Sequence, residues 1–436
     1  MNKIQQLMFP SLPPLSTRYG TLSSATGQIA TVRGLEGRAG IGTRVRIKRN
    51  DFDLEGEIIR DTDEGLTIAL YGSGRGLYSG MRVECIDQED LRPGPDWLGK
   101  VLDHEGRDAS AIPPSPGPKP ILLENRPPAP GHRREMGSRL RTGLGAMDTF
   151  LPLCRGQRIG LFAGSGVGKT SLLGKLATQS DADVNIIALI GERGREVRSF
   201  VEHTLGPEAM KRTIVFAATS DQPPAIKLRA ARLAMATAES FRDTGQHVLF
   251  LFDSLTRYAQ AHREVALAAG EVPALRAYPP STFPALAQLC ERAGPGHING
   301  TGDITAVFSV LVQGSDMEEP IADTVRGILD GHVVLDRAIA ESGRYPAIDI
   351  GRSISRALPG AATQEENMIL SKSRHLIRRF EDGQLMVQSG LYKAGSDPVL
   401  DKAVIAWPKL EHFLQKDDYM DIAAAFSDLN SCLTDS

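Results

Sequence analysis

The first part of the chain alternates apolar and polar positions in short runs. These runs cover Gln28–Val32, Arg44–Lys48, Leu54–Arg60, Leu66–Tyr71 and Met81–Ile86, and glycine-rich turns such as Gly72–Gly76 separate them. A period of two residues is typical of strands that bury one face. About five short strands at this spacing predict a small β-barrel within residues 1–95.

A proline-rich stretch follows the predicted barrel. Residues 110–130 contain eight prolines, and proline lacks the backbone N–H group that a helix interior or a central strand needs. We therefore expect residues 96–141 to form a semi-rigid, extended connector. A proline-rich ligand for a partner protein is the alternative.

Beyond residue 142, apolar strand-like runs alternate with helical segments. The apolar runs are Arg158–Ala163, Val184–Ile190, Thr213–Ala217, Val248–Phe252 and Ile304–Val312, and the clearest helical segments are Thr170–Thr178 and Ala225–Phe241. This alternation predicts an α/β domain with a largely parallel sheet over residues 142–362. Residues 363–436 have a helical pattern. Their basic residues Lys372, Arg374, Arg378 and Arg379 are interpreted as a solvated helix face, with a binding patch as the alternative.

Composition narrows the class of protein. The 436 residues carry a formal net charge of −3, which argues against wholesale binding of nucleic acid or acidic membranes. The longest apolar run, Ile304–Val312, is far shorter than the ~18 residues of a membrane span, so we expect a cytosolic protein. The four cysteines lie far apart in the chain. Free thiols in a reducing cytosol are expected, although two disulfides are formally possible.

The most specific motif is RIGLFAGSGVGKTSLLGKLA, residues 158–177. A buried strand, a glycine-rich loop and a helix that opens at Lys169 would direct backbone N–H groups at a phosphate chain. Lys169 would reach the β- and γ-phosphates of ATP, and the Thr170 hydroxyl would hold Mg²⁺. The motif's first glycine is replaced by Ala163. The predicted nucleotide-binding residues here are Ala163, Gly164, Ser165, Gly166, Val167, Gly168, Lys169, Thr170 and Ser171.

Two carboxylates follow other apolar runs. Asp253 ends the run HVLFLFD and would lie at the carboxyl edge of the sheet, where it would hold magnesium through its water shell. Glu192 follows the run Val184–Ile190 and could orient the water that attacks the γ-phosphate. Spacing alone leaves two roles open for Glu192, a catalytic one and a structural one in the charged run of residues 192–198.

A fourth segment, RYPAIDIGRSISR, spans residues 344–356. Its pattern predicts little beyond a proline-containing turn and a loop. On pattern alone, Arg356 could be any surface arginine.

Together the four segments resemble the α/β family of hexameric rotary-type ATPases, and within it the flagellar and type III protein-export ATPases. The export branch is indicated by TGLGAMDTFLPLCRGQRIGLFAGSGVGKT, IGERGREV, YPPSTFPALAQLCERAG and VLVQGSDMEEPIADTVRGILDGHVVLDR. The resemblance covers nearly the whole chain, is most specific over residues 142–360, and favours the flagellar branch over the injectisome branch. It implies a RecA-like P-loop core between an N-terminal β-barrel and a helical C-terminal domain.

The resemblance also implies roles that spacing does not. Glu192 matches the glutamate that activates the attacking water. Arg356 matches an arginine finger that reaches into the neighbouring subunit's site. Tyr345 matches an aromatic that stacks on adenine, and Tyr392 is a candidate second wall. Basic positions near the phosphates and after the magnesium aspartate are matched by Arg193 and Arg257.

A finger supplied by a neighbour implies a homohexameric ring with ATP between subunits. Expected partners are export-gate membrane proteins, a regulator or stator protein, a central stalk protein, export chaperones and their substrates, and no nucleic acid. The expected place is the cytoplasm, at the cytoplasmic face of the inner-membrane export apparatus. The stretch before the barrel is shorter than the relatives' helical leader, which contacts the membrane and the regulator.

Three other functions share parts of this pattern. The catalytic subunit of a rotary ATP synthase has the same core. A non-catalytic nucleotide-binding subunit keeps the P-loop but usually replaces the glutamate that Glu192 matches. An RNA-translocating hexameric helicase also joins a barrel to an α/β motor, but the 12 basic and 12 acidic residues of residues 1–95 balance, which argues against that function.

Overall fold

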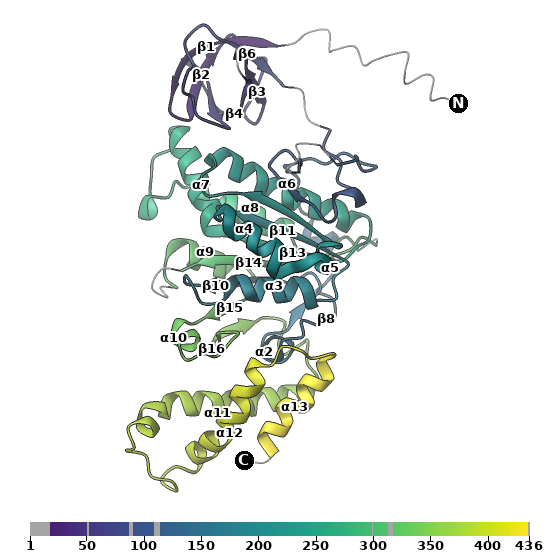
Figure 1. The fold of residues 1–436 in the computed structure, drawn as a ribbon, viewed down its shortest axis with the longest axis vertical. Coiled ribbons are helices and arrows are strands. Elements are labelled where there is room, and N and C mark those ends of the chain that lie inside the picture. Colours follow the sequence, from purple (N-terminus) through teal and green to yellow (C-terminus); the bar gives the residue numbers. More distant parts are fainter. Residues whose placement is uncertain are drawn as a thin grey trace, which may run out of the picture.

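The computed structural model describes residues 18–49, 52–86, 90–108, 114–298, 300–312 and 317–434. A small barrel, a central α/β domain and a helical region follow one another along the longest axis of the molecule (Figure 1). This arrangement confirms the fold class expected from the sequence. The stretch before Arg18, including the shorter leader expected there, lies outside the described residues.

The barrel consists of β1 (Tyr19–Thr26), β2 (Ile29–Arg33), β3 (Arg44–Ile47), β4 (Leu54–Thr62), β5 (Gly65–Leu70) and β6 (Arg82–Cys85). It closes in the order β1-β2-β5-β4-β3-β6. The sequence predicted about five strands and missed β1, whose stretch YGTLSSAT buries only Gly20 and Leu22. β1 pairs with both β2 and β6, so its place follows from closing the barrel, which removes the exposed edges of the sheet.

The central sheet contains β7 (Val101–Leu102), β10 (Arg158–Ala163), β11 (Val184–Ile190), β12 (Thr213–Ala218), β13 (Val248–Asp253), β14 (Ile304–Leu311), β15 (Gly331–Leu335) and β16 (Ile348–Ser355). Its order is β16-β15-β10-β14-β13-β11-β12-β7. All neighbouring strands are parallel except β15 and β16. Both faces are covered, which explains why the parallel strands are largely apolar. In β11, for example, Ile187 packs into one core and Ile186 into the other.

Helices cover the two faces of this sheet. One face carries α6 (Pro224–Asp243), α7 (Leu255–Ala268), α8 (Thr282–Arg292) and α9 (Pro320–Ile328). The other carries α3 (Lys169–Gln179), α4 (Gly194–Ser199), the π-helix η3 (Phe200–Leu205) and α5 (Gly206–Met210). The core of this second face continues without a break into the helical region at the C-terminal end.

The helical region contains α11 (Gln364–Gln388), α12 (Pro398–Gln415) and α13 (Ile422–Thr434). Thr363 caps α11 in a reciprocal capping box with Glu366, which fixes where the helix begins. The interpretation of the basic residues of α11 as a solvated face holds for Lys372 and Arg378, which are exposed, but is wrong for Arg374. The Arg374 guanidinium donates to the backbone oxygens of Ile350 and Phe150 and ties α11 to the central domain.

Two segments differ from their predicted form. Residues 344–356 are not only a turn and a loop, because they include β16 at the edge of the sheet. Within the expected connector, β7 pairs with β12.

The shorter elements are η1 (Pro95–Trp97), η2 (Pro130–His132), β8 (Arg139–Leu140), α2 (Gly145–Thr149), β9 (Leu153–Cys154), η4 (Leu275–Ala277) and α10 (Arg337–Glu341).

The four cysteines are all buried and free, as expected. Within the described ranges, no helix is both long enough and apolar enough to cross a membrane.

Candidate active site

A cavity of about 830 Å³ opens where the parallel strands of the central sheet end. It receives residues from the ends of β10, β11, β14 and β15 and from the first turn of α7. The carboxyl edge of an open α/β sheet is where such domains bind ligands. Its lining comprises residues 163–170, Gly191, Glu192, Arg193, Glu196, Ser220, Thr256, Arg257, Gln260, Leu311, Val312, Glu319, Leu335 and Arg337.

The loop from β10 to α3 forms one wall of this cavity. Gly166 and Gly168 have φ values of 79° and 88°, a left-handed conformation that residues with a side chain rarely adopt. Ala163 tolerates its methyl group because it is still part of β10, paired with Leu311 and Leu335. The departure from the motif therefore falls where no glycine conformation is needed. Ser171 lies on the exposed side of α3, outside the lining.

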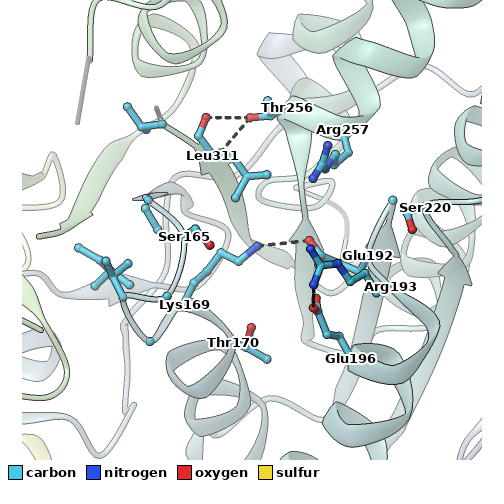
Figure 2. A pocket seen from close by; sticks show the side chains of 18 of the residues that line it. Ser165, Lys169, Thr170, Glu192, Arg193, Glu196, Ser220, Thr256, Arg257 and Leu311 are labelled. Atoms are coloured by element: carbon cyan, nitrogen blue, oxygen red, sulfur yellow. Dashed lines mark hydrogen bonds and ion pairs between the residues drawn. The ribbon is translucent and has the colours of Figure 1, made fainter. Parts of the chain in front are cut away.

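Lys169 extends from the start of α3 across the cavity (Figure 2). Its ammonium donates to the Asp253 carboxylate and lies 3.5 Å from Oε1 of Glu192. The three residues come from three elements that are widely separated in sequence. The strand order places β13 beside β11, so the sheet brings the predicted lysine and both predicted carboxylates together.

The two carboxylates experience different environments. Burial and the nearby negative charge of Asp253 raise the pKa of Glu192, and Lys169 partly offsets this. Asp253 is only 3% exposed and accepts a hydrogen bond of 2.6 Å from the Ser309 hydroxyl on β14. The sequence analysis missed Ser309, although a serine within the apolar run of β14 was a usable signal.

Arg193 and Arg257 both line the cavity. Arg193 precedes α4 and has one guanidinium nitrogen 3.6 Å from Glu196. Arg257 lies on α7 with its side chain against Gly191, where an added Cβ would be 3.0 Å from the arginine's Cγ. In Figure 2 the two guanidinium groups lie on the same side of the cavity as Glu192. Both positive groups therefore line the same cavity as Lys169.

Tyr345 lies beside the P-loop but is not part of the cavity lining. A Cβ added to Gly168 would be 3.2 Å from the tyrosine ring. The tyrosine is 46% exposed. Tyr392 is also outside the lining, in the turn between α11 and α12, where its hydroxyl donates to Asp401 over 2.6 Å.

Arg356 is exposed and lies at the opposite edge of the sheet. β16 runs antiparallel to β15, with Ile348 opposite Leu335 at the cavity edge and Ser355 opposite Gly331. The eight residues of β16 span about 25 Å at ~3.3 Å per residue. Arg356 therefore does not reach the cavity of its own chain.

Known protein families match the nucleotide-binding domain and the helical region. Residues 143–355 match the nucleotide-binding domain of the ATP synthase alpha/beta family, and residues 362–431 match the C-terminal domain of the type III secretion ATPase EscN. The flagellum-specific ATP synthase of Caulobacter vibrioides is 42% identical over 408 residues, 92% of each chain. That of Salmonella typhimurium is 43% identical over 418 residues, 93% of this chain and 91% of the relative.

The chain belongs to the flagellar and type III secretion ATPases of the ATP synthase alpha/beta family. Solved structures of this family agree with the fold. The assembled EscN of enteropathogenic E. coli superposes with a TM-score of 0.88 at 36% identity, covering 95% of this chain and all of EscN. EscN in complex with its central stalk EscO gives a TM-score of 0.85 at the same identity and coverage.

Membership of this ATPase family confirms the resemblance found in the sequence and makes the chain an ATP-hydrolysing enzyme. The C-terminal match to EscN and the flagellar relatives disfavour a rotary ATP synthase subunit. The roles of the individual site residues stay predictions.

Proposed function

We propose that this chain hydrolyses Mg-ATP at the interfaces of a homohexameric ring and that hydrolysis energises flagellar protein export. The observation that carries the proposal is the convergence of Lys169, Glu192 and Asp253 at one edge of the sheet. These are a phosphate-binding cation, a water-orienting carboxylate and a metal-binding carboxylate, the set that phosphoryl transfer requires.

The oxygen ligands present suit Mg²⁺. Among the described residues no group of three or more His, Cys, Asp or Glu side chains gathers to hold a metal, but Mg²⁺ keeps several waters and needs only one or two protein ligands beside phosphates. Thr170 lines the cavity, and the Ser309 hydrogen bond holds the buried Asp253 carboxylate in place. Bound between them, Mg²⁺ would neutralise part of the phosphate charge.

The residues then divide the reaction between them. Glu192 orients a water in line with the γ-phosphorus and polarises its O–H bond. A bond forms between the water oxygen and phosphorus, the bond from phosphorus to the β–γ bridging oxygen breaks, and the water's proton leaves to the phosphate or the solvent. Lys169 balances charge on the β- and γ-phosphates. Arg193 and Arg257 add positive potential at the same side of the cavity, and products are ADP and phosphate.

A neighbouring subunit would complete this site. Arg356 lies about 25 Å along β16 from the cavity edge, and a guanidinium is suited to charge spread over the γ-phosphoryl oxygens. In a ring, each Arg356 would face the cavity of the next subunit. It would act there on the γ-phosphate, although it does not reach the cavity of its own chain. The assembled state of EscN supports a ring for this chain.

Base recognition is assigned to Tyr345, with Tyr392 as the candidate second wall. We expect Tyr345→Ala to raise the KM for ATP about tenfold and leave kcat within a factor of two, because stacking on a base contributes about 1–3 kcal/mol. Steady-state assays of phosphate release check this. Tyr78→Ala, which removes a similarly exposed tyrosine from the barrel, is the control and should leave KM unchanged. An unchanged KM in Tyr345→Ala would contradict the assignment.

Flagellar export is favoured over injectisome secretion because the flagellum-specific ATP synthases of Caulobacter vibrioides and Salmonella typhimurium are 42% and 43% identical, whereas EscN is 36% identical. The proposed partners are a central stalk protein, as EscO is for EscN, a regulator or stator, export-gate membrane proteins, export chaperones and substrates. The proposed place is the cytoplasmic face of the inner membrane.

Deleting the gene in its host is expected to abolish motility and secretion of the filament protein, because export would lose its ATP-driven step. Swimming assays and immunoblots of the culture medium measure both. Expression of the wild-type chain should restore motility and secretion, whereas an equal amount of the Glu192→Gln chain should not. A deletion strain that swims and secretes filament protein normally would contradict the export function.

A further inference from the structure

Arg344 immediately precedes Tyr345 and is only 6% exposed. An arginine is always charged in proteins, and placing it away from water is costly without compensating groups. The turn that contains it joins α10 to β16 at the edge of the nucleotide-binding domain. Its side chain contacts the helical region. The contacts of Arg344 therefore link the nucleotide-binding domain to the helical region.

The contacts of Arg344 reach both long helices of the helical region. Its guanidinium carbon lies 5.9 Å from the centre of the Trp407 ring on α12, which is within cation–π range. Trp407 in turn stacks on Phe380 of α11, with ring centres 4.4 Å apart and an angle of 9° between the planes. The arginine therefore rests on an aromatic pair that holds α11 and α12 together.

Four carboxylates partly offset the cost of burying this charge. Asp336 and Asp349 come from the nucleotide-binding domain, and Glu381 and Glu411 come from α11 and α12. Burial lowers the pKa of Arg344, and the four negative charges reduce this shift without reversing it. The acidic groups lie on both sides of the junction between the nucleotide-binding domain and the helical region. The positive charge of Arg344 therefore attracts carboxylates of both.

Without that cation, carboxylates across the junction would repel each other. A Cβ added to Gly351 would lie 3.4 Å from an oxygen of Asp349 and equally far from an oxygen of Glu381, so the two groups are close. Burial and the charge of Asp349 raise the pKa of Glu381, whereas Arg378 and Arg344 lower it. Arg344 thus offsets repulsion between β16 and α11.

The same turn also touches the nucleotide cavity. Tyr345 packs against Gly168 of the P-loop. Asp336, one of the four carboxylates, caps α10 and stands between Leu335 and Arg337, which both line the cavity. A shift of the helical region would therefore move Tyr345 and Asp336 through Arg344.

We propose that Arg344 is a positioning residue that holds Tyr345 against the P-loop by tying the turn before β16 to α11 and α12, and so makes nucleotide affinity depend on the position of the helical region. The inference rests on the base-stacking role proposed for Tyr345. A ligand or partner that moves α11 and α12 would change ATP affinity through this residue.

The test is a double-mutant cycle of Arg344→Gln and Tyr345→Ala, read as KM and kcat for ATP in the full-length chain. Arg344→Gln is expected to raise KM about fivefold with kcat within a factor of two, because the two neighbouring residues are expected to be energetically coupled. Arg344→Lys should recover most of the wild-type KM, since it keeps the charge. In the Tyr345→Ala background, Arg344→Gln should have almost no further effect on KM.

Arg374→Gln is the matched control. It removes another largely buried arginine that ties α11 to the central domain, but its contacts are with Ile350 and Phe150 rather than with the Tyr345 turn. This variant should lower Tm and leave KM unchanged.

The outcomes separate the two claims. If Tyr345→Ala itself leaves KM unchanged, the base-stacking role is wrong and the inference falls with it. If Tyr345→Ala raises KM but Arg344→Gln only lowers Tm, as Arg374→Gln does, the base-stacking role stands and the positioning role is overturned. Effects on KM that multiply in the double variant would also overturn it.

Discussion

Glu192→Gln chains are expected to bind ATP with near-native affinity and to lose about 10³-fold in kcat, the scale of a positioned general base. Glutamine keeps the shape of the side chain but cannot polarise the attacking water. The loss of negative charge also removes the repulsion with Asp253 that raises the pKa of Glu192. Binding is measured with a fluorescent ATP analogue, and turnover is measured by phosphate release.

Glu196→Gln provides the matched control for this prediction. Glu196 lies on α4, lines the same cavity and is close enough to influence the pKa of Glu192. It carries no proposed chemical role, so its variant should keep kcat within a few-fold of the wild type. Hydrolysis at the wild-type rate in Glu192→Gln would contradict the proposed mechanism, and the attacking water would then need another base.

Arg356→Ala chains are expected to retain ATP binding and to lose about 10³-fold in kcat, the lower end of the range for arginine fingers. In the proposed site, Lys169, Thr170 and Asp253 of one chain would hold the nucleotide and its Mg²⁺, so we expect affinity to be preserved. Charge on the γ-phosphoryl oxygens grows only during the reaction, and the missing guanidinium affects that step.

The control for this variant is Arg378→Ala. Arg378 is an exposed arginine on α11 with an ion pair to Asp382 only one turn away, and surface pairs of this kind contribute little. Its variant should hydrolyse ATP at the wild-type rate. Full activity in Arg356→Ala would show that the finger is a different residue.

The hydrophobic pattern of the sequence predicted the strands that are buried on both faces. β11 and β13 are buried along their whole length, and their sequences are apolar except for Asn185 in β11 and Asp253 at the end of β13. β16 was missed because Gly351 and Arg352 interrupt the alternation. Beyond them the pattern is reversed, since Ser353 and Ser355 are buried and Ile354 is exposed. β1 was missed because barrel closure, rather than its own composition, fixes its place. Arg374 was misread because its backbone partners lie far away in sequence.

The same distinction applies to the site. Lys169 was predicted from its strand, loop and helix motif, and Asp253 from its place at the end of an apolar run. The parallel sheet brings the two residues together. Ser309 depends on a neighbouring strand, which the sequence alone does not order. Tyr345 approaches Gly168 through tertiary packing. The position of Arg356 has a chemical meaning only if a second copy of the chain is considered.

The central claim is that Lys169 and Arg356 of different chains form one site. Lys169→Ala and Arg356→Ala chains are each expected to be nearly inactive as homo-oligomers. When the two are mixed in equal amounts and allowed to form rings, random assembly gives about a quarter of the interfaces an intact Lys169 facing an intact Arg356. Phosphate release should then rise to roughly a quarter of the wild-type rate. A mixture that forms rings and stays as inactive as its components would contradict a site shared between subunits.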